Sequence, residues 1–148
     1  IEVKSNQSSA KIIPNNQFSI DFEIDFPSQL VSKQSCQLQL INGNYKTDIA
    51  AARTFGFEKD VHNLRANGLA LGGSLENAVV VGKDNILNKE GLRFDDEFVR
   101  HKILDSIGDL YLAGMPIQGY FFGLKSGHFL NIQLLQKLFS DKSNFDII

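Results

Sequence analysis

Hydrophobic and polar residues alternate in one early segment of the chain. From Phe18 to Phe26 every second residue is Phe or Ile, and the residues between them are Ser, Asp or Glu. A period of two sustained over this length predicts a β-strand with one buried face and one solvent-facing face. Pro27 ends the pattern because proline cannot continue a strand ladder.

A shorter alternation runs from Gln37 to Leu40, and Asn42-Gly43 then supplies a turn that tolerates positive φ. We expect Tyr45 to Ile49 to be the returning strand of this hairpin. The N-terminal third of the chain is therefore predicted to be β structure.

After Phe57 the pattern changes to a mixture of helical and strand periods. Turn residues and apolar runs divide this part into short elements. The predicted elements are a helix over 60–66, a turn over 69–73, strands over 79–81 and 117–124, and a helix over 131–139.

The longest predicted helix begins at Asp95-Asp96 and ends at about Ala113, before Gly114 and Pro116. At about 100° per residue its apolar residues form one broad stripe. The stripe consists of Val99, Ile103, Leu104, Ile107, Leu110 and Tyr111. On the opposite side, His101, Asp105 and Asp109 follow one another at i, i+4 and i+8 and span only about 80° of the helix surface.

Strands joined by short turns and mixed with helices predict an α+β fold, with a mixed or antiparallel sheet and helices packed on one side. The length of 148 residues suits one domain. A net charge of -2 provides no broad basic field, so nucleic acid is not an expected partner. No apolar run is long enough to cross a bilayer, so we expect no transmembrane segment.

The helix face with His101 and Asp105 matches a two-ligand metal motif, because an imidazole and a carboxylate one turn apart can bind a single ion. A catalytic zinc usually takes three protein ligands, so these two are incomplete by themselves. Two simpler interpretations stay open at this point. The face can be merely solvated, and the two residues can form a modest ion pair.

Two other segments also carry candidate chemistry. In Lys125-Ser126-Gly127-His128, between the aromatic strand and the last helix, His128 is a candidate general acid if a carboxylate keeps it protonated. The simpler interpretation is a surface histidine in a turn. Thr54 can donate to a developing oxyanion, or its segment can be a plain strand with a glycine kink.

Together, four segments resemble one enzyme family. They are Ala52–Phe57, Gly68–Ser74, Asn88–Asp109 (NKEGLRFDDEFVRHKILDSIGD) and Lys125–His128. Their order and spacing are similar to those of the second, C-terminal domain of the zinc-dependent UDP-3-O-acyl-N-acetylglucosamine deacetylases of lipid A biosynthesis. The likeness is close from about Ile49 to Phe139 and loose from Ile1 to Asp48. It implies that residues 1–148 form that domain, one half of a two-domain α/β sandwich whose first domain lies outside this chain.

The resemblance also implies roles for individual residues. His101 and Asp105 correspond to zinc ligands, and the third ligand belongs to a Glu-His pair of the first domain that also supplies the general base. No such pair occurs in this chain. Asp109 is expected to pair with His128, the general acid, and Thr54 is expected beside the oxygen that zinc binds.

The substrate-binding residues that the resemblance implies come from three places. Phe55 is expected near the sugar, and Lys102 and Lys125 are expected to hold the nucleotide-sugar. The stretch from about 57 to 81 is similar to a βαβ insert whose apolar passage holds the acyl chain. The suggested lining of that passage is Leu69, Leu71, Gly73, Ala78 and Val80.

The opening segment departs from the family pattern. A Gly-Asp-Lys-type turn is expected near Asn6 to Lys11, where this chain has Asn-Gln-Ser-Ser-Ala-Lys with Lys11 out of register. Phe26-Pro27 also replaces the usual His-Pro pair. These differences concern the nucleotide end of the site and leave the zinc and acid residues untouched.

The implied reaction is hydrolysis of the N-acetyl group of UDP-3-O-acyl-N-acetylglucosamine, the committed step of lipid A biosynthesis in Gram-negative bacteria. The implied location is the cytoplasm, including the face of the inner membrane. The isolated chain is expected to bind zinc weakly and to be inactive without the first domain. The alternatives are a non-catalytic module that binds the acyl-UDP-sugar and a coincidental α+β structural domain.

Overall fold

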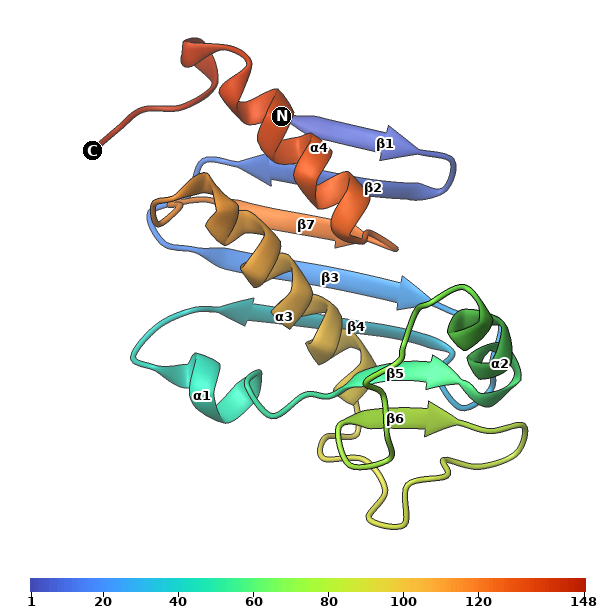
Figure 1. Ribbon diagram of the computed structural model, residues 1–148. Helices are drawn as coiled ribbons and strands as arrows, with labels where there is room; N and C mark the ends of the chain where they lie inside the picture. The colour runs from blue at the N-terminus through green and yellow to red at the C-terminus, as the bar shows by residue number, and fades with distance from the viewer.

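The chain forms a five-stranded sheet, a separate two-stranded sheet and two long helices, and the computed structural model describes all of residues 1–148 (Figure 1). The strand order in the larger sheet is β1-β2-β7-β3-β4. The bounds are β1 Glu2–Ser5, β2 Ser8–Ile13, β3 Ser19–Asp25, β4 Lys33–Gln39 and β7 Tyr120–Leu124. Only the β3–β7 pair is parallel, so the sheet is mixed.

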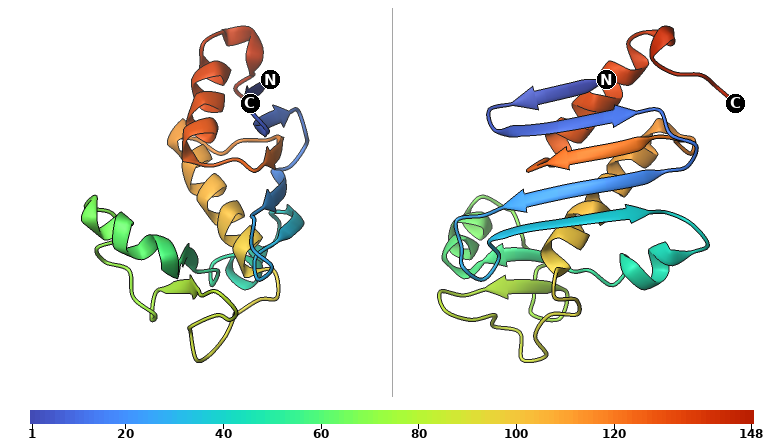
Figure 2. Two further views of the ribbon diagram at one scale, coloured as in Figure 1. Left: turned by 90° about the vertical axis from the view of Figure 1, so that its right-hand side faces the viewer. Right: turned by 180° about the vertical axis from the view of Figure 1, so that it is seen from behind.

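The long helices α3 (Glu97–Leu110) and α4 (His128–Phe139) cover one face of this sheet (Figure 2). α3 packs on β3 and β4, and α4 packs on β1 and β2. The expected α+β fold with helices on one side is confirmed. The other helical segments are short. These segments are α1 Asn44–Asp48, α2 Glu58–Ala66, and the 3-10 turns Tyr111–Ala113 and Lys142–Asn144. None of the helices is long and apolar enough to span a bilayer.

The hydrophobic core lies between the sheet and the two helices. Ile20, Phe22 and Ile24 of β3 are buried, as their alternation predicts, and the polar residues between them face the open side. Phe22 packs so closely on β7 that a Cβ at Gly123 would come within 2.4 Å of its ring. The sheet at this point therefore requires glycine.

A βαβ unit extends the fold below β4 in the view of Figure 1. It consists of β5 (Thr54–Phe57), α2 and β6 (Ala78–Val81), and β5 and β6 pair in parallel. The expected βαβ insert is present, although its first strand begins three residues earlier than the expected start at 57. Asn88 anchors β6 from outside, accepting from the amide of Val80 and donating to the carbonyl of Ala78.

Two local predictions are wrong. Tyr45 to Ile49 is not a returning strand, because Asn44 begins the short helix α1. The Asn44 side chain accepts from the amide of Ile41 and donates to the carbonyl of Gln39, which fixes a helical turn in place of a hairpin. Tyr111 does not belong to the buried stripe, since it lies in the 3-10 turn after α3 with 72% of its surface exposed.

A buried ion pair joins the βαβ unit to α3. The side chains of Arg53 and Glu97 are 3% and 0% exposed, and Nε of Arg53 donates to Oε1 of Glu97 at 2.9 Å. Glu97 also accepts from the backbone amides of Arg53 and Arg93, at 2.9 and 2.6 Å. Every buried polar side-chain atom in the chain has a partner. The pair is thus buried with its hydrogen bonds complete, as such charges require.

Removal of one partner of this pair should be strongly destabilising. Glu97→Leu leaves the Arg53 guanidinium buried without its counter-charge, and we expect a loss of about 3–5 kcal/mol in the free energy of unfolding. Urea denaturation measures this. Glu90→Gln is the matched control, because Glu90 also bonds Arg53 but is 56% exposed, and its effect should be much smaller. Equal effects of the two changes would contradict the role of the buried pair.

The same pair should make the fold sensitive to acid. Burial raises the pKa of Glu97, but hydrogen bonds from Arg53 and from the amide of Arg93 outweigh burial, so its pKa lies below the ordinary value of 4.5. A carboxyl group whose pKa is lower in the folded state than in the unfolded state stabilises the fold at pH values above its unfolded-state pKa. This stabilisation is lost as the pH falls through its folded-state pKa. The free energy of unfolding, measured by urea denaturation at a series of pH values from 6 downwards, should therefore decrease with pH. Below about pH 4.5 this decrease should be less steep in Glu97→Gln than in the wild type. Identical slopes would contradict this.

Candidate functional site

The polar face of α3 is mostly shielded from solvent. The side chains of His101, Lys102, Asp105 and Asp109 are only 14%, 16%, 15% and 13% exposed. A merely solvated helix face would expose such residues far more. The simple solvated-face interpretation is therefore wrong for this helix.

The imidazole of His101 is oriented by the strand-side backbone. Its Nδ1 lies 3.2 Å from the carbonyl oxygen of Ala52. A carbonyl oxygen can only accept, so Nδ1 carries the hydrogen and, in the neutral ring, Nε2 carries the lone pair. A backbone carbonyl on one ring nitrogen is the arrangement that prepares the other nitrogen for a metal.

Nε2 of His101 faces Oδ1 of Asp105 at 3.3 Å. Two electron-rich atoms face each other stably only if a proton or a metal cation lies between them. On its other oxygen, Asp105 accepts from Nζ of Lys102 at 2.8 Å. No group of three or more potential metal ligands occurs in the chain. These two donors could hold a metal ion only with further ligands from outside these residues, and the same contact is an ion pair when His101 is protonated.

His128, the first residue of α4, pairs with α3. Its Nδ1 lies 2.9 Å from both carboxylate oxygens of Asp109. A carboxylate accepts only, so Nδ1–H donates and Nε2 is the nitrogen left free for chemistry. The His128 side chain is 68% exposed. It is therefore a surface histidine, as the simpler interpretation has it, but one held by a carboxylate on a neighbouring helix.

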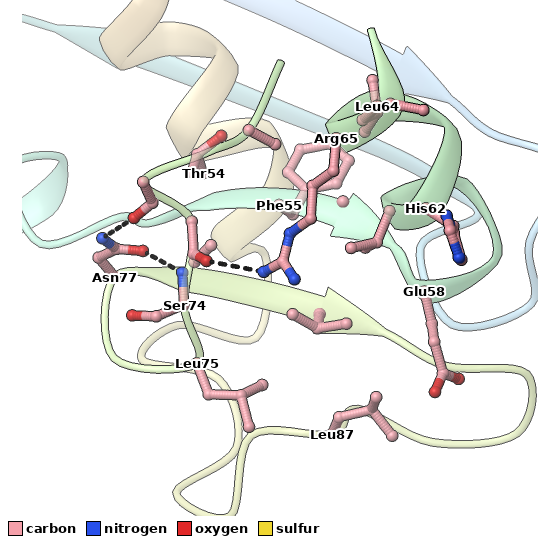
Figure 3. A pocket seen from close by; sticks show the side chains of 18 residues that line it. Thr54, Phe55, Glu58, His62, Leu64, Arg65, Ser74, Leu75, Asn77 and Leu87 are labelled. Carbon is pink, nitrogen blue, oxygen red and sulfur yellow. Dashed lines mark hydrogen bonds between the residues drawn. The ribbon is translucent and has the colours of Figure 1, made fainter. Parts of the chain in front are cut away.

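A large cavity opens between β5, α2 and the loop before β6 (Figure 3). Its volume is about 1220 Å³, and half of its 18 lining residues are hydrophobic. Thr54 and Phe55 line it from β5, and the Arg65 side chain reaches toward the carbonyl oxygen of Gly73, which accepts its hydrogen bond at 3.4 Å. This volume and the hydrophobic part of the lining offer room for an alkyl chain.

The expected passage residues divide into two groups. Gly73, Ala78 and Val80 line the cavity. Leu69 and Leu71 do not, and they are 57% and 71% exposed. Both lie in the turn after α2, on either side of Ala70, which has a left-handed conformation and itself lines the cavity, while the two leucine side chains face solvent. Leu64, Leu75 and Leu87 supply apolar surface that the sequence pattern does not single out.

Phe55 connects the cavity to helix α3. Its ring packs edge-on against Phe98 of α3, with centroids 4.9 Å apart, and lies 6.5 Å from the His101 ring. Phe26 contacts Phe55 from the other side at 5.5 Å. Phe26, where the resemblance led us to expect a histidine, is thus part of an aromatic cluster around Phe55.

Lys125 lies at a second, smaller hollow, which it lines together with His128 and three residues of the β1–β2 hairpin, Ser5, Asn6 and Ser8. Its Nζ donates to Oδ2 of Asp25 at 2.7 Å, and this bond lowers the pKa of the Asp25 carboxyl. Lys11 is not part of this hollow. It alternates with buried Ala10 and Ile12, so it lies on the open face of the sheet, over the Phe122 ring.

The site residues thus form three groups. His101, Lys102 and Asp105 form the first, His128 and Asp109 form a second one turn further along α3, and Thr54 and Phe55 line the cavity. A family model described as UDP-3-O-acyl N-acetylglycosamine deacetylase matches residues 1–140. The chain belongs to this deacetylase family.

Relatives with curated names support the assignment to the deacetylase family. The chain is 51% identical over 150 residues to the UDP-3-O-acyl-N-acetylglucosamine deacetylase of Psychrobacter cryohalolentis, with 100% of this chain and 47% of the relative covered. It is 50% identical to the enzyme of that name from Psychrobacter arcticus, with the same coverage. It is 49% identical over 145 residues to the enzyme of that name from Syntrophus aciditrophicus, with 98% of this chain and 46% of the relative covered. The chain spans about half the length of the curated relatives it matches.

Asn131, a buried polar residue at the site, was not among the residues that the family resemblance implied. Asn131 is fully buried in the first turn of α4 and bonds Asp109. In the sequence, Asn131 stands out only as a polar residue among the apolar residues Leu130, Leu134 and Leu135 of a helix that packs on the sheet. Its partners are 5 to 25 residues away in the sequence, and only the folded structure identifies them.

Proposed function

We propose that this chain is the second domain of a zinc-dependent enzyme that hydrolyses the N-acetyl group of UDP-3-O-acyl-N-acetylglucosamine. The observation that carries the proposal is the paired arrangement on α3. His101 and Asp105 face each other one turn before Asp109 holds His128. Family membership and the names of the relatives support the substrate and the reaction.

Zinc is the proposed cofactor, held by Nε2 of His101 and a carboxylate oxygen of Asp105, with its third ligand from the first domain. When bound, the ion polarises the amide carbonyl and lowers the pKa of a coordinated water. The Ala52 carbonyl keeps the His101 ring in the tautomer that leaves Nε2 available.

His128 is the proposed general acid. Water adds its oxygen to the acetyl carbon, with its proton removed by the base of the first domain. As the C–N bond breaks, its electron pair stays on the nitrogen, which takes the proton from Nε2 of His128. The products are acetate and the free amine of the sugar. Asp109 bonds Nδ1 and balances the charge of the imidazolium form.

The other residues have proposed roles in binding. Thr54 donates its hydroxyl to the oxyanion of the tetrahedral intermediate, and Phe55 contacts the sugar. Lys102 and Lys125 bind the anionic nucleotide end. The cavity between β5, α2 and β6 holds the acyl chain, with Gly73, Ala78 and Val80 in its wall. The proposed location is the cytoplasm, at or near the inner face of the inner membrane, where an acylated substrate is met.

Loss of one zinc ligand should remove both metal and activity. In the full-length protein, we expect Asp105→Asn to lower bound zinc, measured by elemental analysis, and to lower turnover by about 100-fold or more, because even outer partners of metal ligands contribute up to that factor. Asp60→Asn on the exposed face of α2 is the matched control and should change neither. The isolated chain of 148 residues should show no turnover. Full zinc content and full activity in Asp105→Asn would contradict the proposal.

Loss of the acid should lower kcat with little change in KM. We expect His128→Ala in the full-length protein to reduce kcat by about 100- to 10,000-fold, since proton transfer to the leaving amine is lost while the cavity is unchanged. Steady-state release of acetate measures this. If the wild-type protein binds the acyl-UDP-sugar tightly but releases no acetate, the non-catalytic binding module is the correct function.

A further inference from the structure

Asn131 links the candidate acid to the interior of the domain. It lies three residues after His128 in α4 and is fully buried. Its Nδ2 donates to Oδ2 of Asp109 at 2.8 Å and to Oγ of Ser106 at 3.2 Å. Its Oδ1 accepts from the hydroxyl of Ser126 at 2.7 Å. One amide therefore connects the KSGH turn, the start of α4 and the last turns of α3.

The neighbours allow only one orientation of this amide. The carboxylate of Asp109 cannot donate, and the Ser106 hydroxyl already donates to the carbonyl of Lys102 at 2.9 Å. Both therefore need a donor, which only Nδ2 provides. A flipped amide would place Oδ1 against a carboxylate and a hydroxyl lone pair in a buried site, which is costly.

The orientation of His128 depends on this arrangement. The imidazole is 68% exposed and its side chain bonds only Asp109. The Asp109 carboxylate is 13% exposed, and Asn131 is its one partner besides His128. The chain of contacts thus runs from a buried amide, through a shielded carboxylate, to an exposed imidazole ring.

We propose that Asn131 is a positioning residue for the reaction. By holding Oδ2 of Asp109 it fixes the plane of the carboxylate that orients Nδ1 of His128, so that Nε2 keeps one direction for proton transfer. The inference rests on the proposed function, since it requires His128 to act on the substrate. A purely structural amide at the α3–α4 interface would give a different pattern of coupling.

A double-mutant cycle in the full-length protein separates the two roles. Asn131→Leu keeps the approximate volume and removes all three hydrogen bonds. We expect kcat for acetate release to fall about 10- to 100-fold, with KM within about two-fold. Added to Asp109→Asn, the same change should cause no further loss of kcat, because it acts through that carboxylate. The same fold-loss in both backgrounds, or no loss in either, would overturn the inference.

Asn88→Leu is the matched control, because Asn88 is the other buried asparagine and bonds only the β6 region. Whatever its effect on kcat, that effect should be equal with and without Asp109→Asn. If Asn131→Leu does not fold, as thermal melting would show, Ser126→Ala replaces it in the cycle. It removes only the bond to Oδ1, and its smaller loss of kcat should likewise vanish in Asp109→Asn.

The outcomes also separate this inference from the proposed function. Suppose that the wild type releases acetate and His128→Ala is slow, but the fold-losses of kcat caused by Asn131→Leu and by Asp109→Asn multiply in the double variant. Asn131 is then purely structural, and only this inference fails. If the wild-type protein releases no acetate from the acyl-UDP-sugar, the proposed function fails first and the inference fails with it.

Discussion

The buried pair of Arg53 and Glu97 is the interaction on which the site depends. It ties the residue before Thr54 to the first turn of α3, one turn before His101. The carbonyl of Ala52, the other neighbour of Arg53, receives the Nδ1–H of that histidine. A charged pair inside a domain is tolerable only with its hydrogen bonds complete, and here backbone amides complete them. The same contacts that satisfy the charge therefore set the spacing between the strand with Thr54 and the helix with His101 and Asp105.

Helix α3 divides its surface between two tasks. Its apolar side packs on β3 and β4, while its polar side presents one ionisable residue per turn at His101, Asp105 and Asp109. The polar side is shielded by α4 and by the βαβ unit, so these residues lie in a medium where hydrogen bonds and charges act more strongly than in water. Two hollows adjoin the other site residues. The larger is bounded by β5, α2 and the loop before β6, and the smaller adjoins Lys125 and the β1–β2 turn.

The family resemblance led us to expect a cation in the turn between β1 and β2, and the structure shows which groups lie there instead. Lys11 lies on the open face of the sheet and cannot replace a cation in the β1–β2 turn. That turn nevertheless lies beside Lys125 and His128, so Ser5, Asn6 and Ser8 present hydroxyl and amide groups at the place where a cation is expected. Phe26, at the position where a histidine was expected, packs its ring against Phe55.

The sequence by itself determined the features that repeat along the chain. The strand around Phe22, the helix from Glu97 to Leu110 and the row of His101, Asp105 and Asp109 follow from periods of two and 3.6, which are properties of consecutive residues. The returning strand at Tyr45 failed because one side chain, Asn44, formed a local turn that hydrophobic patterning cannot detect. The pairing of His128 with Asp109 was expected from the family resemblance, although no periodicity predicts it. Tertiary structure alone revealed that His101 meets the Ala52 carbonyl and that Asn131 bonds both helices. It also excluded Leu69 and Leu71 from the cavity wall. Such contacts depend on how separate elements pack, and packing is determined by the whole core, whereas periodicity is determined by each segment alone.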